Sequence, residues 1–249
     1  MEYIRILFED VKQHYVDYYR QIGGGIDGYY ERTIVDADVY ELYDNEPVGC
    51  FTIHKDRGLT SFVFYNQEGI GYHNCFQFIL GLPIVKSVLF TENAIRLMES
   101  VRKEELEFEI QSYNFYVTKK IFSSLEMIQV LKEDIPMIQK RFNEFISYNN
   151  INLDEVTSFY YKQNNDIICF GALEPLRLNQ KRYCISMIVN EAYRNMNYGS
   201  ETVKFLIQYL QENNLEANAR CYVENEVSKK TLLKSGMDIS NKLYKVYLY

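Results

Sequence analysis

The most informative segment of this 249-residue chain lies between an apolar strand and an amphipathic helix, and it reads Arg194-Asn195-Met196-Asn197-Tyr198-Gly199-Ser200. A loop that ends in a helix N-terminus presents unpaired backbone N–H groups and the positive end of the helix dipole. Gly199 permits close approach of the backbone, Asn197 tolerates a positive φ, and Arg194 adds charge. The segment is therefore predicted to bind an anion, most simply a phosphate group.

Periodicity on both sides of this loop predicts the elements of the second half of the chain. Residues 182–189 alternate as a strand does, and the helix after Gly199 has apolar residues at helical spacing. Asn213-Asn214 can end that helix, because asparagine tolerates the left-handed cap conformation. The other expected elements are a strand (125–131), a helix (134–148), a hairpin (157–161 and 167–173), a strand (217–223), a helix (225–234) and a closing strand (244–249).

The first half of the chain is predicted to repeat the same order of elements. They are a helix (5–20), a glycine loop (23–28), a three-strand meander (39–43, 48–54 and 59–65), a helix (69–82), a strand (85–90), a helix (92–102) and a strand (106–117). Gly71 would match Gly199, and Glu92-Asn93 would match Glu224-Asn225. We place a domain boundary near residues 118–121, which predicts domains at 1–118 and 121–249.

The loop and its flanks resemble the GNAT superfamily of acetyl-CoA-dependent N-acyltransferases, whose signature here is [RQ]-x-x-G-x-[GA]. Arg194 and Gly199 match it, whereas Asn197 stands where the family prefers glycine. The segment from Asn225-x-x-Ser228 to Lys234-Ser235-Gly236-Met237 is similar to a second family motif. The resemblance covers residues 121–249 and implies an α/β (α+β) fold. The fold that we expect from it is a tandem of GNAT-like domains, each a mixed, mostly antiparallel twisted sheet flanked by helices.

The resemblance also implies a set of residues that bind acetyl-CoA or another acyl-CoA. The amides of residues 195–200, with Arg194, would hold the pyrophosphate, and the preceding strand would bind the pantetheine arm and polarise the thioester carbonyl. Asn225 would contact pantetheine as well. The expected cofactor-binding residues are Met187, Ile188, Val189, Arg194, Asn195, Met196, Asn197, Tyr198, Gly199, Ser200, Asn225 and Ser228.

The catalytic residues depart from the family pattern. The family often has a tyrosine four residues before the glycine of the second motif, and this chain has Leu232 there. Tyr222 is our candidate acid and Glu224 our candidate base, with Tyr244, Ser228 and Glu174 as alternatives. Base catalysis through ordered water is a further alternative. The competing interpretation is a packing or edge role for Tyr222, Tyr244 and Ser228, and a solvated surface charge for the two glutamates.

The first half is predicted to have the same order of elements but lacks the residues expected to bind a phosphate group. Its loop, residues 66–71, is shorter, has no arginine at the matching place and carries Glu68, which would repel a pyrophosphate. We interpret it as a degenerate GNAT-like domain that completes an acceptor cleft or supports its partner. An unrelated α+β domain is the alternative.

Composition argues against several other classes of protein. A net charge of −7 disfavours nucleic-acid and membrane binding. The five cysteines form no C-x-x-C pair and the three histidines have no ligand spacing, so we expect neither a disulfide framework nor a metal site. The first residues, Met1-Glu2-Tyr3-Ile4-Arg5, have no basic segment followed by an apolar core, so we expect no signal peptide. The most apolar stretch, 75–85, is too short to span a bilayer. We therefore expect a cytoplasmic protein.

These patterns lead to one function and two alternatives. We predict an N-acetyltransferase that moves an acetyl group from acetyl-CoA to an amine of a small molecule or peptide. The alternatives are a non-catalytic acyl-CoA-binding or sensing protein and a structural protein that keeps only the fold. The net negative charge suits a cationic acceptor such as a polyamine or aminoglycoside. The charge is unevenly distributed along the chain, since residues 1–120 hold 19 acidic and 12 basic side chains and residues 121–249 hold 15 of each. A homodimer is compatible with the sequence.

Overall fold

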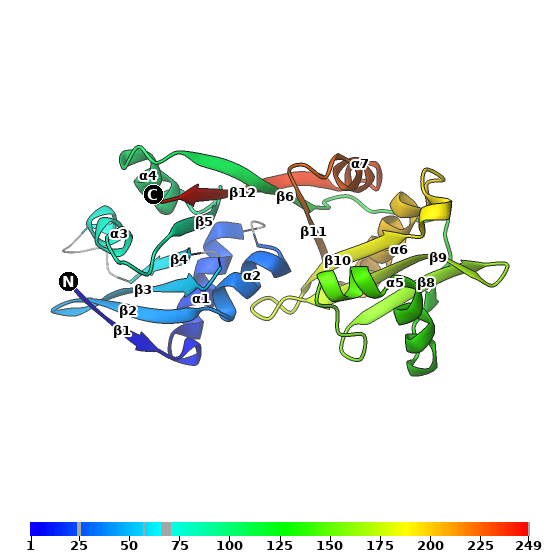
Figure 1. The fold of residues 1–249 in the computed structure, drawn as a ribbon, viewed down its shortest axis with the longest axis horizontal. Helices are drawn as coiled ribbons and strands as arrows, with labels where there is room; N and C mark the ends of the chain where they lie inside the picture. The colour runs from blue at the N-terminus through cyan, green and yellow to red at the C-terminus, as the bar shows by residue number, and fades with distance from the viewer. Residues whose placement is uncertain (24–25, 57, 66–70, 249) are drawn as a thin grey trace. The chain divides into compact units, whose positions relative to one another are not determined.

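The computed structural model describes residues 1–23, 26–56, 58–65 and 71–248, which form two compact units (Figure 1). The first unit combines Met1–Asn114 with Ser240–Tyr249, and the second is Phe115–Ile239. Each has a mixed, mostly antiparallel sheet with helices packed on it, so the expected fold class is confirmed. Among the described helices, none is both long and apolar enough to cross a membrane.

The sheet of the first unit has the order β1-β2-β3-β4-β5-β12-β6. Its strands are β1 (Glu2–Ile6), β2 (Asp38–Asp44), β3 (Glu46–His54), β4 (Gly58–Phe64), β5 (Ser87–Thr91), β6 (Phe108–Tyr116) and β12 (Asp238–Tyr247). The helices are α1 (Phe8–Ile22), α2 (Gly28–Val35), α3 (Tyr72–Leu80) and α4 (Ile95–Lys103). The meander predicted from sequence is thus β2, β3 and β4, and β4 and β5 run parallel with one paired position, Leu59 to Val88.

The start of the chain differs from the single helix expected over residues 5–20. β1 pairs with β2 along its whole length, from Glu2 opposite Tyr43 to Ile6 opposite Val39. The helix begins only at Phe8, where the Asp10 carboxylate accepts a hydrogen bond from the Leu7 N–H at 3.2 Å. The apolar residues of a five-residue edge strand therefore merged with those of the following helix into one helical pattern.

A second helix, α2, follows the glycine loop and was not expected from the sequence. Its N-cap is Asp27, whose carboxylate accepts from the Tyr30 N–H at 2.9 Å. The Tyr30 hydroxyl is buried and donates to the Thr60 carbonyl at 2.8 Å, which fixes α2 against β4. Gly24 and Gly25 of the predicted loop lie outside the described residues.

The last strand corrects the predicted domain boundaries. β12 pairs antiparallel with β5, from Leu243 opposite Thr91 to Tyr247 opposite Ser87, and so residues 240–249 belong to the first unit. The buried Asn241 carboxamide oxygen accepts from the Asn114 side chain at 2.9 Å. The domain predicted at 121–249 therefore lacks its final strand in the structure, because that strand completes the sheet of the first unit.

The second unit has the strand order β11-β10-β9-β8-β7. These strands are β7 (Ile128–Gln129), β8 (Thr157–Gln163), β9 (Asp166–Pro175), β10 (Arg182–Val189) and β11 (Glu216–Tyr222), and the α-helices are α5 (Ile135–Tyr148), α6 (Tyr198–Glu212) and α7 (Glu226–Lys234). All neighbouring strands are antiparallel except β10 and β11, which are parallel. These elements agree closely with those expected from periodicity.

Helices cover both faces of the second sheet. Phe170 and Ala172 of β9 pack in one buried cluster with Ile138 and Phe142 of α5. A Cβ on Gly171, which points the other way, would stand 2.7 Å from the Leu206 side chain of α6. We call these two faces the α5 side and the α6 side.

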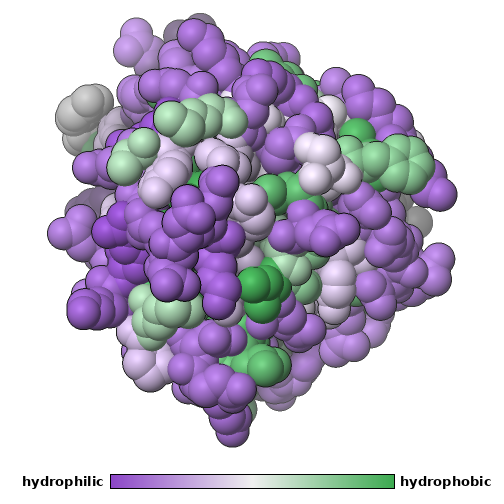
Figure 2. Space-filling view, turned by 90° about the vertical axis from the view of Figure 1, so that its right-hand side faces the viewer, coloured by the Kyte–Doolittle hydropathy of each residue, from purple (hydrophilic) through white to green (hydrophobic). Residues whose placement is uncertain are grey.

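The part of the molecular surface seen in Figure 2 is mostly hydrophilic, with apolar residues in small separate groups.

Candidate functional site

The parallel strands β10 and β11 separate partway along their length. They pair at Arg182–Glu216, Tyr183–Ala217 and Cys184–Asn218, and no described pair continues the ladder beyond these. The Arg182 guanidinium bonds the Glu216 carboxylate at 2.8 Å at the closed end. On its other edge β10 stays paired with β9 as far as Val189. The edge of β10 from 185 to 189 therefore faces an opening in the sheet, with backbone groups available to a ligand.

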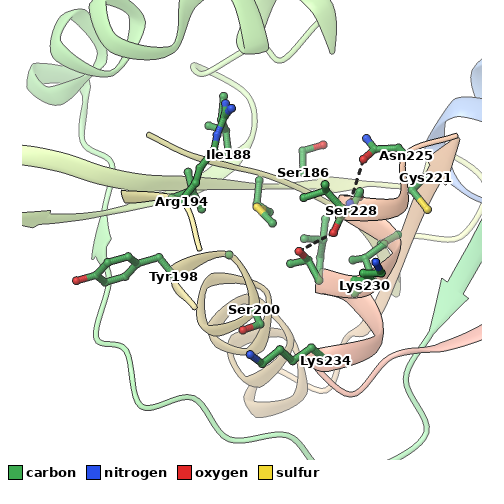
Figure 3. A pocket seen from close by; sticks show the side chains of 18 of the residues that line it. Ser186, Ile188, Arg194, Tyr198, Ser200, Cys221, Asn225, Ser228, Lys230 and Lys234 are labelled. Atoms are coloured by element: carbon green, nitrogen blue, oxygen red, sulfur yellow. Dashed lines mark hydrogen bonds between the residues drawn. The ribbon is translucent and has the colours of Figure 1, made fainter. Parts of the chain in front are cut away.

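A cleft of about 1110 Å³ occupies this opening. Its walls come from β10, the loop after it, the first turn of α6, the end of β11, α7 and the end of α5 (Figure 3). Of the expected cofactor-binding residues all but Met196 line it, and they are Met187, Ile188, Val189, Arg194, Asn195, Asn197, Tyr198, Gly199, Ser200, Asn225 and Ser228. The Met196 side chain is 61% exposed and lies outside the lining.

The three expected residues of β10 do not share a face. Met187 and Val189 point to the α6 side, where their side chains would lie 3.1 and 3.6 Å from a Cβ on Gly199. Ile188 packs on the α5 core cluster. The side chains of β10 thus point to opposite sides of the sheet, and only the β10 backbone borders the cleft on both sides. This agrees with the expected role of that backbone in binding the pantetheine arm.

The loop after β10 is held in a shape that only a few residue types adopt easily. Asn195 and Asn197 both have left-handed backbone conformations, with φ of 66° and 68°. Asn190 anchors the loop, since its side chain donates to the Ile167 carbonyl at 3.1 Å and accepts from the Ala192 N–H at 3.3 Å. The Asn197 carbonyl accepts from the Glu201 N–H at 3.1 Å, which begins α6.

The first turn of α6 leaves backbone donors toward the cleft. The N–H groups of Tyr198, Gly199 and Ser200 precede the first intrahelical hydrogen bond, so helix geometry gives them no acceptor within the helix. A Cβ on Gly199 would meet Met187 at 3.1 Å and Thr231 at 3.3 Å. The missing side chain therefore keeps a passage open between β10 and α7 beside these donors.

Positive charge gathers around the cleft. Its lining includes Arg194, Arg220, Lys230 and Lys234 and, among the residues that the structure describes, neither an aspartate nor a glutamate. Lys234 donates a hydrogen bond to the Asn197 side-chain oxygen. Arg194 lies 3.1 Å from Glu191, but both side chains are more than half exposed, and such a pair competes weakly with a phosphate. The arrangement suits a polyanionic ligand, in a chain whose net charge is −7.

Asn225 and Ser228 lie at the start of α7. The Asn225 side-chain oxygen accepts from the Ser228 N–H at 3.0 Å and so caps the helix (Figure 3). The cap orients the Asn225 amide group at the cleft, where its NH₂ can serve as a donor. Asn225 thus has a structural role in addition to the expected contact with pantetheine.

The proposed acid and base are placed differently. Tyr222 lines the cleft, whereas Glu224 is exposed in the turn before α7 and outside the lining. Leu232, which stands where the family often has a tyrosine, lines the cleft and is buried. Of the alternatives, Ser228 lines the cleft, Glu174 lies on β9 outside the lining, and Tyr244 packs on Phe90 and Phe108 in the first unit.

Cys221 is a cleft residue that sequence reasoning did not select. Burial raises the pKa of its thiol to about 11, so the group stays protonated and weakly nucleophilic near neutral pH. Sequence reasoning also gave no role in the site to Arg220, Lys230 and Lys234, although Lys234 belongs to the second motif. The spacing of Lys230 and Lys234, four residues apart on one helix, was the signal that could have found two of them.

The corresponding part of the first unit is built differently. Asn93, expected to match Asn225, donates from its side chain to the Ile22 carbonyl at 2.8 Å and does not cap α4. A smaller cavity of about 380 Å³ lies beside it, between β4, α4 and α1. Residues 66–70 of the expected loop lie outside the described part of the chain. No group of three or more metal-binding side chains occurs within the described residues of either unit.

Models of one acetyltransferase family match both units. The model described as "Acetyltransferase (GNAT) family" matches residues 125–237, and the one described as "Acetyltransferase (GNAT) domain" matches residues 7–118. The chain therefore belongs to the GNAT acetyltransferases, as the strand opening and the loop at α6 indicated. More particularly, it is a tandem of two GNAT domains.

Solved structures share this fold over the whole chain. An acetyltransferase of the GNAT family from Colwellia psychrerythraea is 14% identical and superposes with a TM-score of 0.88, with 100% of each chain covered. A tandem GNAT protein from the clavulanic acid biosynthesis pathway is 7% identical, with a TM-score of 0.62 and 99% and 98% covered. At sequence identities this low, the similarity to these structures establishes the fold and no further property. No curated protein matches the chain in sequence.

Proposed function

We propose that the cleft of the second unit binds an acyl-CoA, acetyl-CoA by default, and that the protein transfers the acyl group to an amine. The observation that carries the proposal is the cleft lining, in which four cationic side chains and no described carboxylate surround a helix N-terminus. CoA is a polyanion whose pyrophosphate suits such a site. The family contributes the expectation of acetyl transfer.

The loop and α7 would hold the phosphate groups. The amides of residues 195–200 and the Arg194 guanidinium are the donors for the pyrophosphate, and Lys234 stands beside them through its bond to Asn197. Because Gly199 has no side chain, the ligand can approach the protein backbone closely at this position. These groups are already arranged by the folded loop, so little ordering is required on binding.

The open edge of β10 would hold the pantetheine arm and orient the reacting carbonyl. Acetyl-CoA, when bound, supplies an activated thioester. The backbone N–H groups of residues 185–189 that face the opening can donate to the arm and to the carbonyl oxygen, where negative charge develops during attack. The Asn225 side chain adds a donor from α7.

The protein's contribution to the reaction is mainly positioning. An amine held against the open edge of β10 attacks directly, and the gain comes from proximity and from polarisation of the carbonyl. All three histidines lie in the first unit, and the described lining has no carboxylate. We therefore assign the amine proton to ordered water, and we propose Tyr222, which lines the cleft, as the acid for the leaving thiolate.

A non-catalytic acyl-CoA-binding protein is the second candidate. Leu232 favours it, because this buried leucine stands where the family often has the tyrosine that protonates the leaving thiolate. The two functions differ in a measurement of free CoA thiol. Steady release of thiol from acetyl-CoA in the presence of an amine supports the transferase, and binding without release on a broad amine panel supports the binding protein.

We also infer that the first unit does not hold a CoA. Its Asn93 amide is used by the Ile22 carbonyl, and α1 lines the place where the second unit has its large cleft. Isothermal titration with acetyl-CoA tests both parts of the proposal. We expect one molecule bound per chain; no binding at high micromolar ligand contradicts the proposed function.

A further inference from the structure

The smaller cavity of the first unit is not used by the proposed function. It has a volume of about 380 Å³, and α1, the end of β4, the start of α3 and the start of α4 form its walls. β4 and β5 pair at the single position Leu59–Val88, so the edge of β4 beyond that pair is open toward the cavity. The volume lies in the range of small-molecule sites and is about a third of that of the cleft in the second unit. The cavity therefore suits a ligand much smaller than CoA.

Aromatic rings form much of the cavity wall. The Tyr72 ring at the start of α3 packs on Phe62 and Phe64 of β4, with ring centroids 4.6 and 5.8 Å apart. We call these three rings the aromatic group. Beside it, the Tyr65 ring stacks on the His14 ring of α1 at 4.1 Å. Because the rings are held by one another, they offer an ordered surface for a further aromatic ring.

One cation and one anion accompany the aromatic group. Among the described lining residues, Arg96 is the one guanidinium and Asp17 the one carboxylate, and they come from different helices, α4 and α1. Arg96 is exposed in the first turn of α4. Burial raises the pKa of the Tyr72 hydroxyl and the Arg96 charge acts to lower it, which places the guanidinium near the aromatic group.

Asp17 is only weakly engaged by the protein itself. Its carboxylate lies 2.9 Å from the Arg20 guanidinium and accepts from the Gln13 side chain at 3.2 Å. The side chains of Asp17 and Arg20 are 49% and 73% exposed, and an ion pair this exposed contributes little. A ligand ammonium can therefore share or replace these contacts.

We propose that this cavity binds a free α-amino acid with an aromatic side chain. The ligand carboxylate pairs with Arg96, its α-ammonium pairs with Asp17, and its ring packs on the aromatic group. A zwitterion matches both charges at once. A simple carboxylate would place a like charge near Asp17, and a simple amine would place one near Arg96. No covalent bond changes at this site, and the binding is independent of acyl transfer.

Titration calorimetry with L-phenylalanine tests the proposal. Phenylacetate lacks the ammonium, phenethylamine lacks the carboxylate, and L-alanine lacks the ring. We expect one L-phenylalanine bound per chain, and we expect each of the other three ligands to have a dissociation constant higher by about tenfold or more.

Two substitutions locate the binding in this cavity. Arg96→Gln and Asp17→Asn should each raise the dissociation constant of L-phenylalanine about tenfold. Arg102→Gln on α4 and Glu9→Gln on α1 are the matched controls, since both residues are exposed and outside the cavity lining. Arg96→Gln should also remove the difference in affinity between L-phenylalanine and phenethylamine, a change that loss of folded protein would not produce.

Three results would overturn the assignment. They are no binding of L-phenylalanine at millimolar concentration, equal affinity of the wild-type protein for phenylacetate or phenethylamine, and unchanged affinity for L-phenylalanine in both cavity variants. Each counts against the amino-acid site whether or not the second unit binds acetyl-CoA, so this proposal and the proposed function fail separately.

Discussion

The Lys234 ammonium donates a hydrogen bond to the side-chain oxygen of Asn197, joining the last residue of α7 to the loop that opens α6. The contact brings a cation from one helix to the N-terminus of another. It also involves the side chain of Asn197, which stands at a position where the family prefers glycine. This pair therefore links the shape of the phosphate loop to its charge.

Replacing Lys234 should weaken cofactor binding. We expect Lys234→Gln to raise the dissociation constant of acetyl-CoA about tenfold, because it removes one charge-assisted contact, and to lessen the loss of affinity with added salt. Titration calorimetry at two salt concentrations measures both effects. Lys229→Gln is the control, since Lys229 lies 3.6 Å from Glu226 and outside the cleft lining. Equal effects of the two substitutions would contradict the role of Lys234.

The left-handed conformation of Asn197 should make this position sensitive to side-chain shape. Asn197→Gly should keep the loop, whereas Asn197→Val should reduce the free energy of unfolding by about 1–2 kcal/mol, because a β-branched residue is strained at φ of 68°. Urea unfolding gives the stabilities, and acetyl-CoA titration gives the affinities. If valine is tolerated as well as glycine, the loop does not require this backbone conformation.

The positions of Tyr222 and Glu224 predict different kinetics. Glu224→Gln should leave kcat/KM within about twofold, because Glu224 does not line the cleft. Tyr222→Phe should lower kcat about tenfold or more and leave the dissociation constant of acetyl-CoA unchanged, because it removes the hydroxyl proposed to protonate the leaving thiolate. Steady-state thiol release measures both variants, and a large loss in Glu224→Gln would restore that residue as the base.

Glu201 couples the start of α6 to the preceding chain and should make stability depend on pH. Burial acts to raise its pKa, but hydrogen bonds from Lys204 and Ser124 and the Lys204 charge lower it to about 2. A carboxyl whose pKa is depressed by folding stabilises the protein above its unfolded pKa of about 4.5, and this contribution is lost as the pH falls toward 2.

Substitution isolates this contribution. Glu201→Gln should flatten the dependence of the melting temperature on pH between about 4.5 and 2, compared with Glu212→Gln at an exposed position on the same helix. Thermal unfolding monitored by circular dichroism supplies the curves. Parallel curves for the two variants would show that Glu201 carries no such linkage.

The sequence predicted the local elements better than their partners. The change from a period of two in residues 182–189 to a helical period after Gly199 is a local signal, and the structure has β10 and α6 there. β12 was assigned to the wrong unit because its partner, β5, lies about 150 residues away and nothing local encodes that pairing. β1 was missed because a short edge strand ran directly into a helix.

Prediction of the cleft was limited in the same way, because local patterns identify only part of its lining. The loop and Gly199 could be identified because one contiguous motif contains them, whereas the absence of carboxylates emerges only when α5, β10, β11 and α7 come together. Phe145 and Arg220 belong to separate elements, and neither has a local pattern that marks it as part of a site. Net charge was misleading for the same reason, since most of the acidity lies in residues 1–120.

The central claim is that one acyl-CoA binds per chain, at the loop of the second unit. Titration calorimetry with acetyl-CoA on two matched variants tests it most directly. Gly199→Trp fills the passage between β10 and α7, whereas Gly71→Trp makes the same change at the corresponding place in the first unit, where a Cβ meets nothing within 4 Å. We predict a stoichiometry of one that is abolished by Gly199→Trp and kept by Gly71→Trp, with both variants folded by circular dichroism. Unchanged affinity in Gly199→Trp, or loss of binding only in Gly71→Trp, would contradict it.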